Sequence, residues 1–70
     1  MINNLSLYRR KADLTQIELA AALGVGTATL SKWENPNFDL KKLSVNTILA
    51  ICNLLNITFK DLSSINGEEI

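Results

Sequence analysis

The stretch TQIELAAALGVGTATLSKWE, residues 15–34, constrains the fold of this chain more than any other part of its sequence. Thr15 is a favourable N-cap residue, and Glu18 follows three positions later, so their side chains can satisfy free backbone N–H groups of a first helical turn. Gly24 is suited to end that helix, because glycine adopts a left-handed backbone conformation at little steric cost. The stretch therefore begins with a short helix whose two ends are marked.

A second helix is predicted from about Thr27 to Glu34, because Leu30 and Trp33 follow the glycine at helical spacing. The turn between the two helices spans about three residues, which favours a helix-turn-helix crossing near a right angle. The first of these helices carries an apolar surface that should pack against a core, made of Ile17, Leu19, Ala20 and Leu23.

Four groups of residues occur in order along this region: Leu14-Thr15-Gln16, Glu18-Leu19-Ala20, Leu23-Gly24-Val25 and Leu30-Ser31-Lys32-Trp33-Glu34. Together they resemble the lambda-repressor-like, Cro-type helix-turn-helix family of phage and bacterial DNA-binding domains, and the resemblance extends more weakly from Leu5 to Leu62. It implies an all-α fold, a compact five-helix lambda-repressor-like domain over residues 1–62 that contains a helix-turn-helix at about 15–34. Residues 63–70 are then expected to form a flexible C-terminal tail.

A helix before the motif should begin near Asn3 or Asn4, either of which can cap it, and continue to about Ala12. Leu5, Tyr8 and Ala12 share one face at spacings of three and four, so we expect them to pack inward.

After the motif, Asn35-Pro36-Asn37 is predicted to end the second motif helix, where relatives commonly carry glycine. Ser44 is expected to cap a fourth helix that ends at Asn56, and Thr58 with Asp61 should start a short fifth helix. The fourth helix has an apolar stripe wide enough to predict burial on more than one side, formed by Val45, Ile48, Leu49, Ile51, Cys52 and Leu55.

The charge balance is unusual for a DNA-binding module, because seven basic and seven acidic residues give a formal net charge of zero. A positive face is still expected, since the basic residues cluster in the sequence as Arg9, Arg10, Lys11 and then as Lys32, Lys41, Lys42. Weak nonspecific binding should follow, with more of the affinity left to directed contacts and to dimerisation.

The sequence lacks most of the residues that enzymatic and metal-binding sites commonly use. The chain has no histidine, no glycine-rich phosphate loop and a single cysteine, Cys52, which its apolar neighbours predict to be a buried structural thiol. We therefore expect no enzyme, no metal, no cofactor and no small-molecule ligand. No apolar run approaches the roughly 18 residues of a membrane span, and no signal-peptide pattern is seen, so we expect a cytoplasmic protein.

The exposed face of the second motif helix carries the residues that we expect to read DNA bases. Leu30 and Trp33 should face the core, and threonine and alanine methyls or a lysine ammonium presented in a major groove can contact base edges. The alternative, a plain solvated helix face, is favoured when the family resemblance is set aside. The predicted base-reading residues are Thr27, Ala28, Ser31 and Lys32.

The remaining site residues are predicted to position the helix or the chain. The resemblance implies that Arg9 pairs with Glu34 and that Gln16 contacts backbone phosphate while supporting the recognition helix; an unpaired surface arginine is the alternative for Arg9. Phosphate contacts position a protein on the duplex without reading its sequence. The phosphate-positioning candidates are Gln16, Thr29, Asn35, Lys41 and Lys42, with simple solvation as the alternative for the two lysines.

The resemblance finally implies a homodimer on double-stranded DNA, with Phe59, Leu62 and Ile65 as candidate contacts and ordinary burial as the equal alternative. We thus expect a sequence-specific phage or bacterial-type transcriptional regulator, with a recognition helix at about 27–34. The competing hypothesis is a module of the same fold that binds a protein partner, for example an antitoxin with little DNA affinity of its own.

Overall fold

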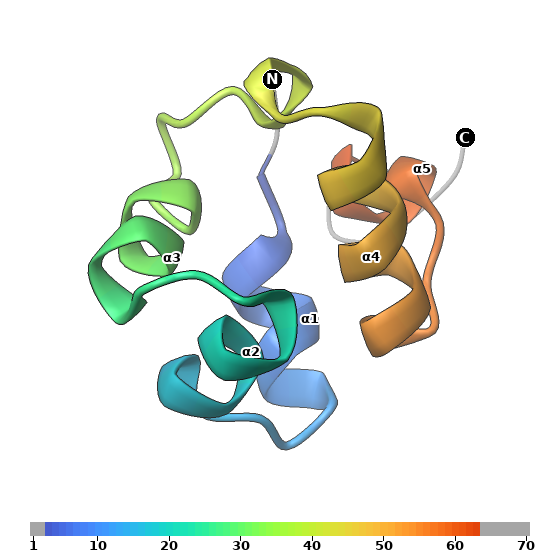
Figure 1. Ribbon diagram of the computed structural model, residues 1–70. Coiled ribbons are helices and arrows are strands. Elements are labelled where there is room, and N and C mark those ends of the chain that lie inside the picture. The colour runs from blue at the N-terminus through green and yellow to red at the C-terminus, as the bar shows by residue number, and fades with distance from the viewer. Residues whose placement is uncertain (1–2, 64–70) are drawn as a thin grey trace.

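A computed structural model of the protein describes residues 3–63 and shows an all-helical fold (Figure 1). Within these residues there is no strand, so the predicted five-helix fold is confirmed. A short 3-10 helix, η1, lies between the second motif helix and the helix that Ser44 caps. The elements are α1 (Leu5–Lys11), α2 (Gln16–Leu23), α3 (Thr27–Trp33), η1 (Leu40–Lys42), α4 (Val45–Leu55) and α5 (Phe59–Ser63).

Side-chain caps are present at the predicted starts of α2, α4 and α5. At α2 the Thr15 hydroxyl accepts a hydrogen bond from the Glu18 backbone N–H at 3.1 Å, and the Glu18 carboxylate accepts one from the Thr15 N–H at 2.8 Å. Thr58 and Asp61 form the equivalent reciprocal pair before α5, at 3.2 and 3.0 Å. Ser44 caps α4 by accepting from the third residue of that helix. Each cap satisfies N–H groups that a helix leaves without internal partners.

Two helices end in the left-handed conformation that the sequence predicts for them. Gly24 follows α2 with φ of 74°, and Asn56 follows α4 with φ of 57°. Asp13 also adopts a positive φ, of 59°, between α1 and α2, where no such conformation was predicted. Asparagine and aspartate tolerate this region better than other residues with a Cβ atom.

A single hydrophobic core joins the elements. In Figure 1, α3 lies on one side and α4 with α5 on the other, and α1 and α2 lie between them. Each fully buried leucine or isoleucine contributes about 1.5 to 3 kcal/mol through removal of its side chain from water. The buried apolar residues are Leu5, Leu19, Ala20, Leu30, Leu40, Ile51, Cys52, Leu55 and Leu62.

Some apolar residues predicted to be buried are exposed instead. Ala12 lies at the C-cap of α1 and faces solvent, and Ile17 is 70% exposed on the first turn of α2. On α4, Val45 and Leu49 are exposed, so the prediction of burial on more than one side is wrong for this helix. The burial of α4 is confined to the stripe that carries Ile51, because only that stripe meets the core and no other described element covers the opposite side.

The described residues end with α5, whose last residue is Ser63. Ser63 falls in the segment predicted as a tail, and the rest of that prediction, residues 64–70, lies outside the described residues. Among residues 3–63, none of the helices has both the length and the apolar character that crossing a membrane requires.

Candidate nucleic-acid interface

Helix α3 is anchored by one fully buried residue, packs partly through Trp33, and presents its other residues to solvent. Leu30 is 0% exposed and anchors the helix in the core, and Trp33 packs partly against the same core. Gly26 stands at the N-cap with no side-chain cap, so its backbone conformation alone begins the helix. The residues predicted to contact DNA from this helix are all exposed, namely Thr27, Ala28, Thr29, Ser31 and Lys32.

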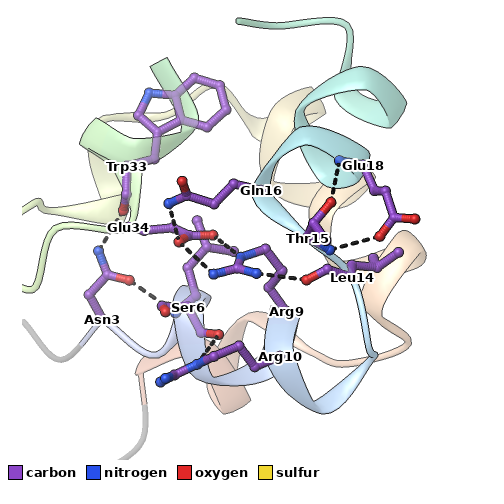
Figure 2. A network of polar contacts seen from close by, with 11 residues as sticks. Asn3, Ser6, Arg9, Arg10, Leu14, Thr15, Gln16, Glu18, Trp33 and Glu34 are labelled. Atoms are coloured by element: carbon purple, nitrogen blue, oxygen red, sulfur yellow. Dashed lines mark hydrogen bonds and ion pairs between the residues drawn. The ribbon is translucent and has the colours of Figure 1, made fainter. Parts of the chain in front are cut away.

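An ion pair between α1 and the end of α3 fixes the angle of that helix (Figure 2). Arg9 donates from Nε to Glu34 Oε2 at 2.6 Å and from Nη2 to Glu34 Oε1 at 3.3 Å. Its third contact goes from Nη1 to the Leu14 carbonyl oxygen at 2.6 Å. The two side chains are only 11% and 5% exposed, so the pair is nearly buried. A two-point bond of this kind restricts rotation of one helix against the other.

Gln16 completes the environment of the Glu34 carboxylate. Its Nε2 donates to Glu34 Oε1 at 3.0 Å, which joins the first turn of α2 to the end of α3 (Figure 2). Both carboxylate oxygens therefore have donors, and the described residues contain no buried side-chain nitrogen or oxygen without a hydrogen-bond partner. Gln16 thus supports α3 from within the protein, and phosphate contact by this residue stays a prediction.

Asn3 makes contacts with the end of α3 that the sequence analysis missed. Its Oδ1 accepts from the Leu5 backbone N–H at 3.1 Å, a local bond to the first residue of α1, while Asn4, the N-cap residue, makes no side-chain cap. Its Nδ2 donates to the main-chain oxygen of Trp33 at 2.8 Å and to those of Asn35 and Phe38 at 3.1 Å each. The only sequence signal for this residue was its cap position, because the acceptors lie 30 to 35 residues away in the chain.

An open hollow lies beside the C-terminal end of α3, lined by Lys32, Asn35, Asn37 and Phe38. The Asn35 side-chain oxygen accepts from the Asn37 backbone N–H at 2.8 Å, which shapes the turn after the helix. Lys41 and Lys42 are exposed on η1, and the Asp39 carboxylate accepts from the Lys41 backbone N–H at 3.0 Å. Base-reading and phosphate-positioning candidates thus lie on α3 and on the segment that follows it.

Comparison with known proteins identifies the family to which this chain belongs. The family model described as helix-turn-helix matches residues 5–62, which is most of the chain. The protein belongs to the lambda-repressor-like, Cro-type helix-turn-helix family. This is a family of DNA-binding, non-enzymatic domains, so the chain is a helix-turn-helix DNA-binding domain.

A curated relative of this helix-turn-helix domain is named antitoxin PezA, from Streptococcus pneumoniae serotype 4 (strain ATCC BAA-334 / TIGR4). The two sequences are 32% identical over 59 residues, which cover 84% of this chain and 35% of the relative. The helix-turn-helix domain therefore spans about a third of the length of the curated relative that it matches.

The basic cluster on α1 of the helix-turn-helix domain is partly committed to internal contacts. Arg9 is spent in the ion pair, and the Lys11 ammonium lies 5.1 Å from the centre of the Tyr8 ring, within range of a cation–π interaction. The Arg10 Nε donates to the Ser6 carbonyl oxygen at 3.3 Å, and its side chain remains exposed. Arg9 therefore adds no unpaired positive charge to the predicted positive face.

One predicted dimer contact of the helix-turn-helix domain is buried within its own chain. Leu62 is 1% exposed and packs in the core of its own chain, so its ordinary burial, the stated alternative, holds. Phe59 is half-buried against the same core. Ile65 lies outside the described residues.

Cys52 is a free, buried thiol of the helix-turn-helix domain. Burial raises the pKa of the Cys52 thiol, and the charge of Asp61 adds to this effect, so the thiol is protonated at neutral pH. A protonated, buried thiol is a poor nucleophile, as expected for a structural cysteine. No group of three or more potential metal ligands occurs among residues 3–63.

Proposed function

We propose that this helix-turn-helix domain binds double-stranded DNA sequence-specifically in the cytoplasm, as a transcriptional regulator. The observation that carries the proposal is the placement of α3: Leu30 is fully buried, Glu34 is clamped to α1 and α2, and the opposite face is open. A rigid exposed helix is what entry into a major groove requires.

Base reading is assigned to the exposed face of α3. The methyl groups of Thr27 and Ala28 can contact the methyl of thymine, and the Ser31 hydroxyl can donate or accept a hydrogen bond. The Lys32 ammonium can donate to guanine O6 or N7. Their common exposure supports this role, because none is needed for the core.

Phosphate positioning is assigned to residues around that face. The Gln16 amide nitrogen has two hydrogens, and its bond to Glu34 uses one, so the other can be donated to a phosphate. Lys41 and Lys42 supply positive charge from η1, with Thr29 and Asn35 as further donors. These contacts would set the register of α3 without reading bases.

We also propose that two copies bind a two-fold related operator whose half-sites lie about one helical turn apart. Phe59, which is only half-buried, and Ile65 are the proposed contacts between copies. A domain of 70 residues has a small core, so self-association would also add stability.

The experiment begins with selection of bound duplexes from a random pool, followed by fluorescence anisotropy on a selected duplex and a scrambled one. We expect Lys32→Ala to weaken binding to the selected duplex by about 1 to 3 kcal/mol, because a base contact is lost, and to relax the preference at one position. Lys11→Ala is the matched control, since it removes the same charge from α1. Equal losses on both duplexes for Lys32→Ala would argue against base reading.

A second candidate function is the binding of a protein partner through the same fold. It is favoured by the name of the relative, an antitoxin, by the zero net charge, and by Val45 and Leu49, which are exposed on α4. Such a module would show little affinity for any duplex. Selection from the random pool at low ionic strength discriminates between the two, because a failure to enrich any duplex favours the protein partner.

A further inference from the structure

We propose that Asn3 is a positioning residue for DNA recognition, which fixes the last turn of α3 and the loop after it. The inference rests on the proposed function, because it assigns Asn3 a part in placing the residues that contact DNA. Asn3 itself lies outside the helix-turn-helix motif, before α1.

Helix α3 ends without the left-handed residue that closes α2 and α4. Its C-cap residue, Glu34, has φ of −84° in the right-handed region. The last carbonyl groups of a helix lack internal partners and need donors from elsewhere. Main-chain N–H groups serve Leu30 and Lys32, and Asn3 Nδ2 serves Trp33 at 2.8 Å. A side chain from the other end of the sequence thus completes the end of the proposed recognition helix.

The same amide group also holds the loop that follows α3. Its Nδ2 lies 3.1 Å from the carbonyl oxygens of both Asn35 and Phe38. Three carbonyl oxygens share the two hydrogens of the nitrogen, and the Leu5 N–H faces Oδ1 at 3.1 Å. The opposite orientation would place Oδ1 against carbonyl oxygens and the NH2 group against an N–H, so only one orientation of the amide fits. Serine and aspartate can retain the bond to Leu5, but neither side chain offers an NH2 group to three carbonyl oxygens.

Asn3 is itself fixed by its neighbours in sequence. The Asn4 N–H donates to the Leu62 carbonyl oxygen at 2.9 Å, and Asn4 Nδ2 donates to that of Asp61 at 3.1 Å, which ties this segment to α5. On the other side, Leu5 is fully buried in the core. The Asn3 amide is therefore a rigid link between the body of the domain and the end of α3.

The hollow beside α3 explains why this link matters for binding. Asn35 and Phe38 line the hollow with Lys32, and Asn3 holds the main chain of the first two. Hydrogen bonds to bases and phosphates are effective over a few tenths of an ångström around 2.9 Å. A loosened helix end would therefore weaken contacts made by Lys32 and Asn35, and base discrimination would fall first.

Asn3→Ser tests the proposal, with Asn4→Ser as the matched control. Serine is neutral and caps helices as well as asparagine, so α1 keeps a cap in both variants. The control removes the bond to Asp61 and leaves the contacts with α3 in place. We expect Asn3→Ser to lower affinity for a selected duplex roughly fivefold or more, with less than about a twofold loss on a scrambled duplex. Asn4→Ser should leave the ratio of the two affinities unchanged.

Asn3→Asp provides a second variant that keeps the cap on Leu5. Its carboxylate accepts from the Leu5 N–H and favours the start of a helix, so the domain should remain folded. It has no NH2 group, and we expect the same loss of discrimination between the selected and scrambled duplexes. The ratio of affinities is the readout, because the added negative charge weakens binding to both duplexes.

Amide hydrogen exchange without DNA separates failure of this inference from failure of the proposed function. In Asn3→Ser the amides of Glu34, Asn35 and Phe38 should exchange faster, while those of Ile51 and Cys52 in α4 keep their wild-type rates. Unchanged exchange at the end of α3 would overturn the inference, whether or not the protein binds DNA. Faster exchange with wild-type discrimination would overturn the role in recognition. A wild-type protein that ignores every duplex would instead overturn the proposed function.

Discussion

At the scale of single residues, the orientation of α3 depends on polar contacts more than on apolar burial. Leu30 is the one residue of α3 that is fully buried and Trp33 packs only partly against the core, so apolar contacts leave the helix some freedom to rotate. Arg9 and Gln16 remove that freedom by binding both oxygens of Glu34. Nearly buried ion pairs add little net stability, because loss of hydration offsets much of the attraction, but they fix geometry.

Removal of the Glu34 carboxylate should therefore be costly. We expect Glu34→Ala to lower the free energy of unfolding by about 3 kcal/mol, because Arg9 keeps its charge in a nearly buried position without a carboxylate partner. Urea denaturation followed by circular dichroism measures the loss. The double variant Arg9→Met, Glu34→Met removes both charges and should be more stable than the single variant. A double variant as unstable as Glu34→Ala would mean that the uncompensated charge is not the cause.

The sequence predicted this pair only through the family resemblance, since nothing local joins residues 25 positions apart. Asn3 shows the limit of the same reasoning. Its bond to Leu5 spans two residues and could be expected from the sequence, whereas its bonds to Trp33, Asn35 and Phe38 depend on where the fold places the segment before α1. Contacts of that kind exist only after the fold has formed.

At the scale of elements, the helix ends were predictable and the buried faces only partly so. Caps use residues two to four positions apart, and therefore the Thr15 and Thr58 caps could be found in the sequence. Burial depends on which side of a helix another element covers. Ile17 and Val45 have suitable apolar character but lie where no described element covers them.

The two glycines of the helix-turn-helix should respond to substitution in opposite directions. Gly26 has φ of −76° with open space around an added Cβ atom, so Gly26→Ser can supply the missing side-chain cap of α3. We expect it to raise the free energy of unfolding by about 0.5 to 1 kcal/mol. Gly24 has φ of 74°, and Gly24→Ala should lower that free energy by about 1 kcal/mol despite the open space around it.

Thermal denaturation of the two variants beside the wild type measures both changes under the same conditions. The pair controls for the loss of a glycine, since both substitutions restrict the unfolded chain in a similar way. A stabilising Gly24→Ala would show that backbone strain at this turn is negligible. A neutral Gly26→Ser would show that the start of α3 gains nothing from a hydroxyl cap.

At the scale of the whole molecule, zero net charge and DNA binding can be reconciled by the distribution of charge. Arg9 is neutralised inside the domain by Glu34, while Lys32, Lys41 and Lys42 remain exposed on α3 and η1. A chain of this kind should bind DNA only weakly without directed contacts. Its binding should depend on the few lysines that reach phosphate. The slope of log affinity against log salt concentration measures how many of them do so.

We therefore expect a moderate salt dependence for two copies on a full operator. Each phosphate neutralised by a lysine contributes about −0.9 to the slope of log affinity against log salt concentration. With Lys41 and Lys42 of both copies in contact, the slope should be about −4. Replacement of both lysines by glutamine should bring it close to zero while the base preference of α3 persists. An unchanged slope would place the phosphate contacts elsewhere, and the exposed Arg10 would then be the first alternative to test.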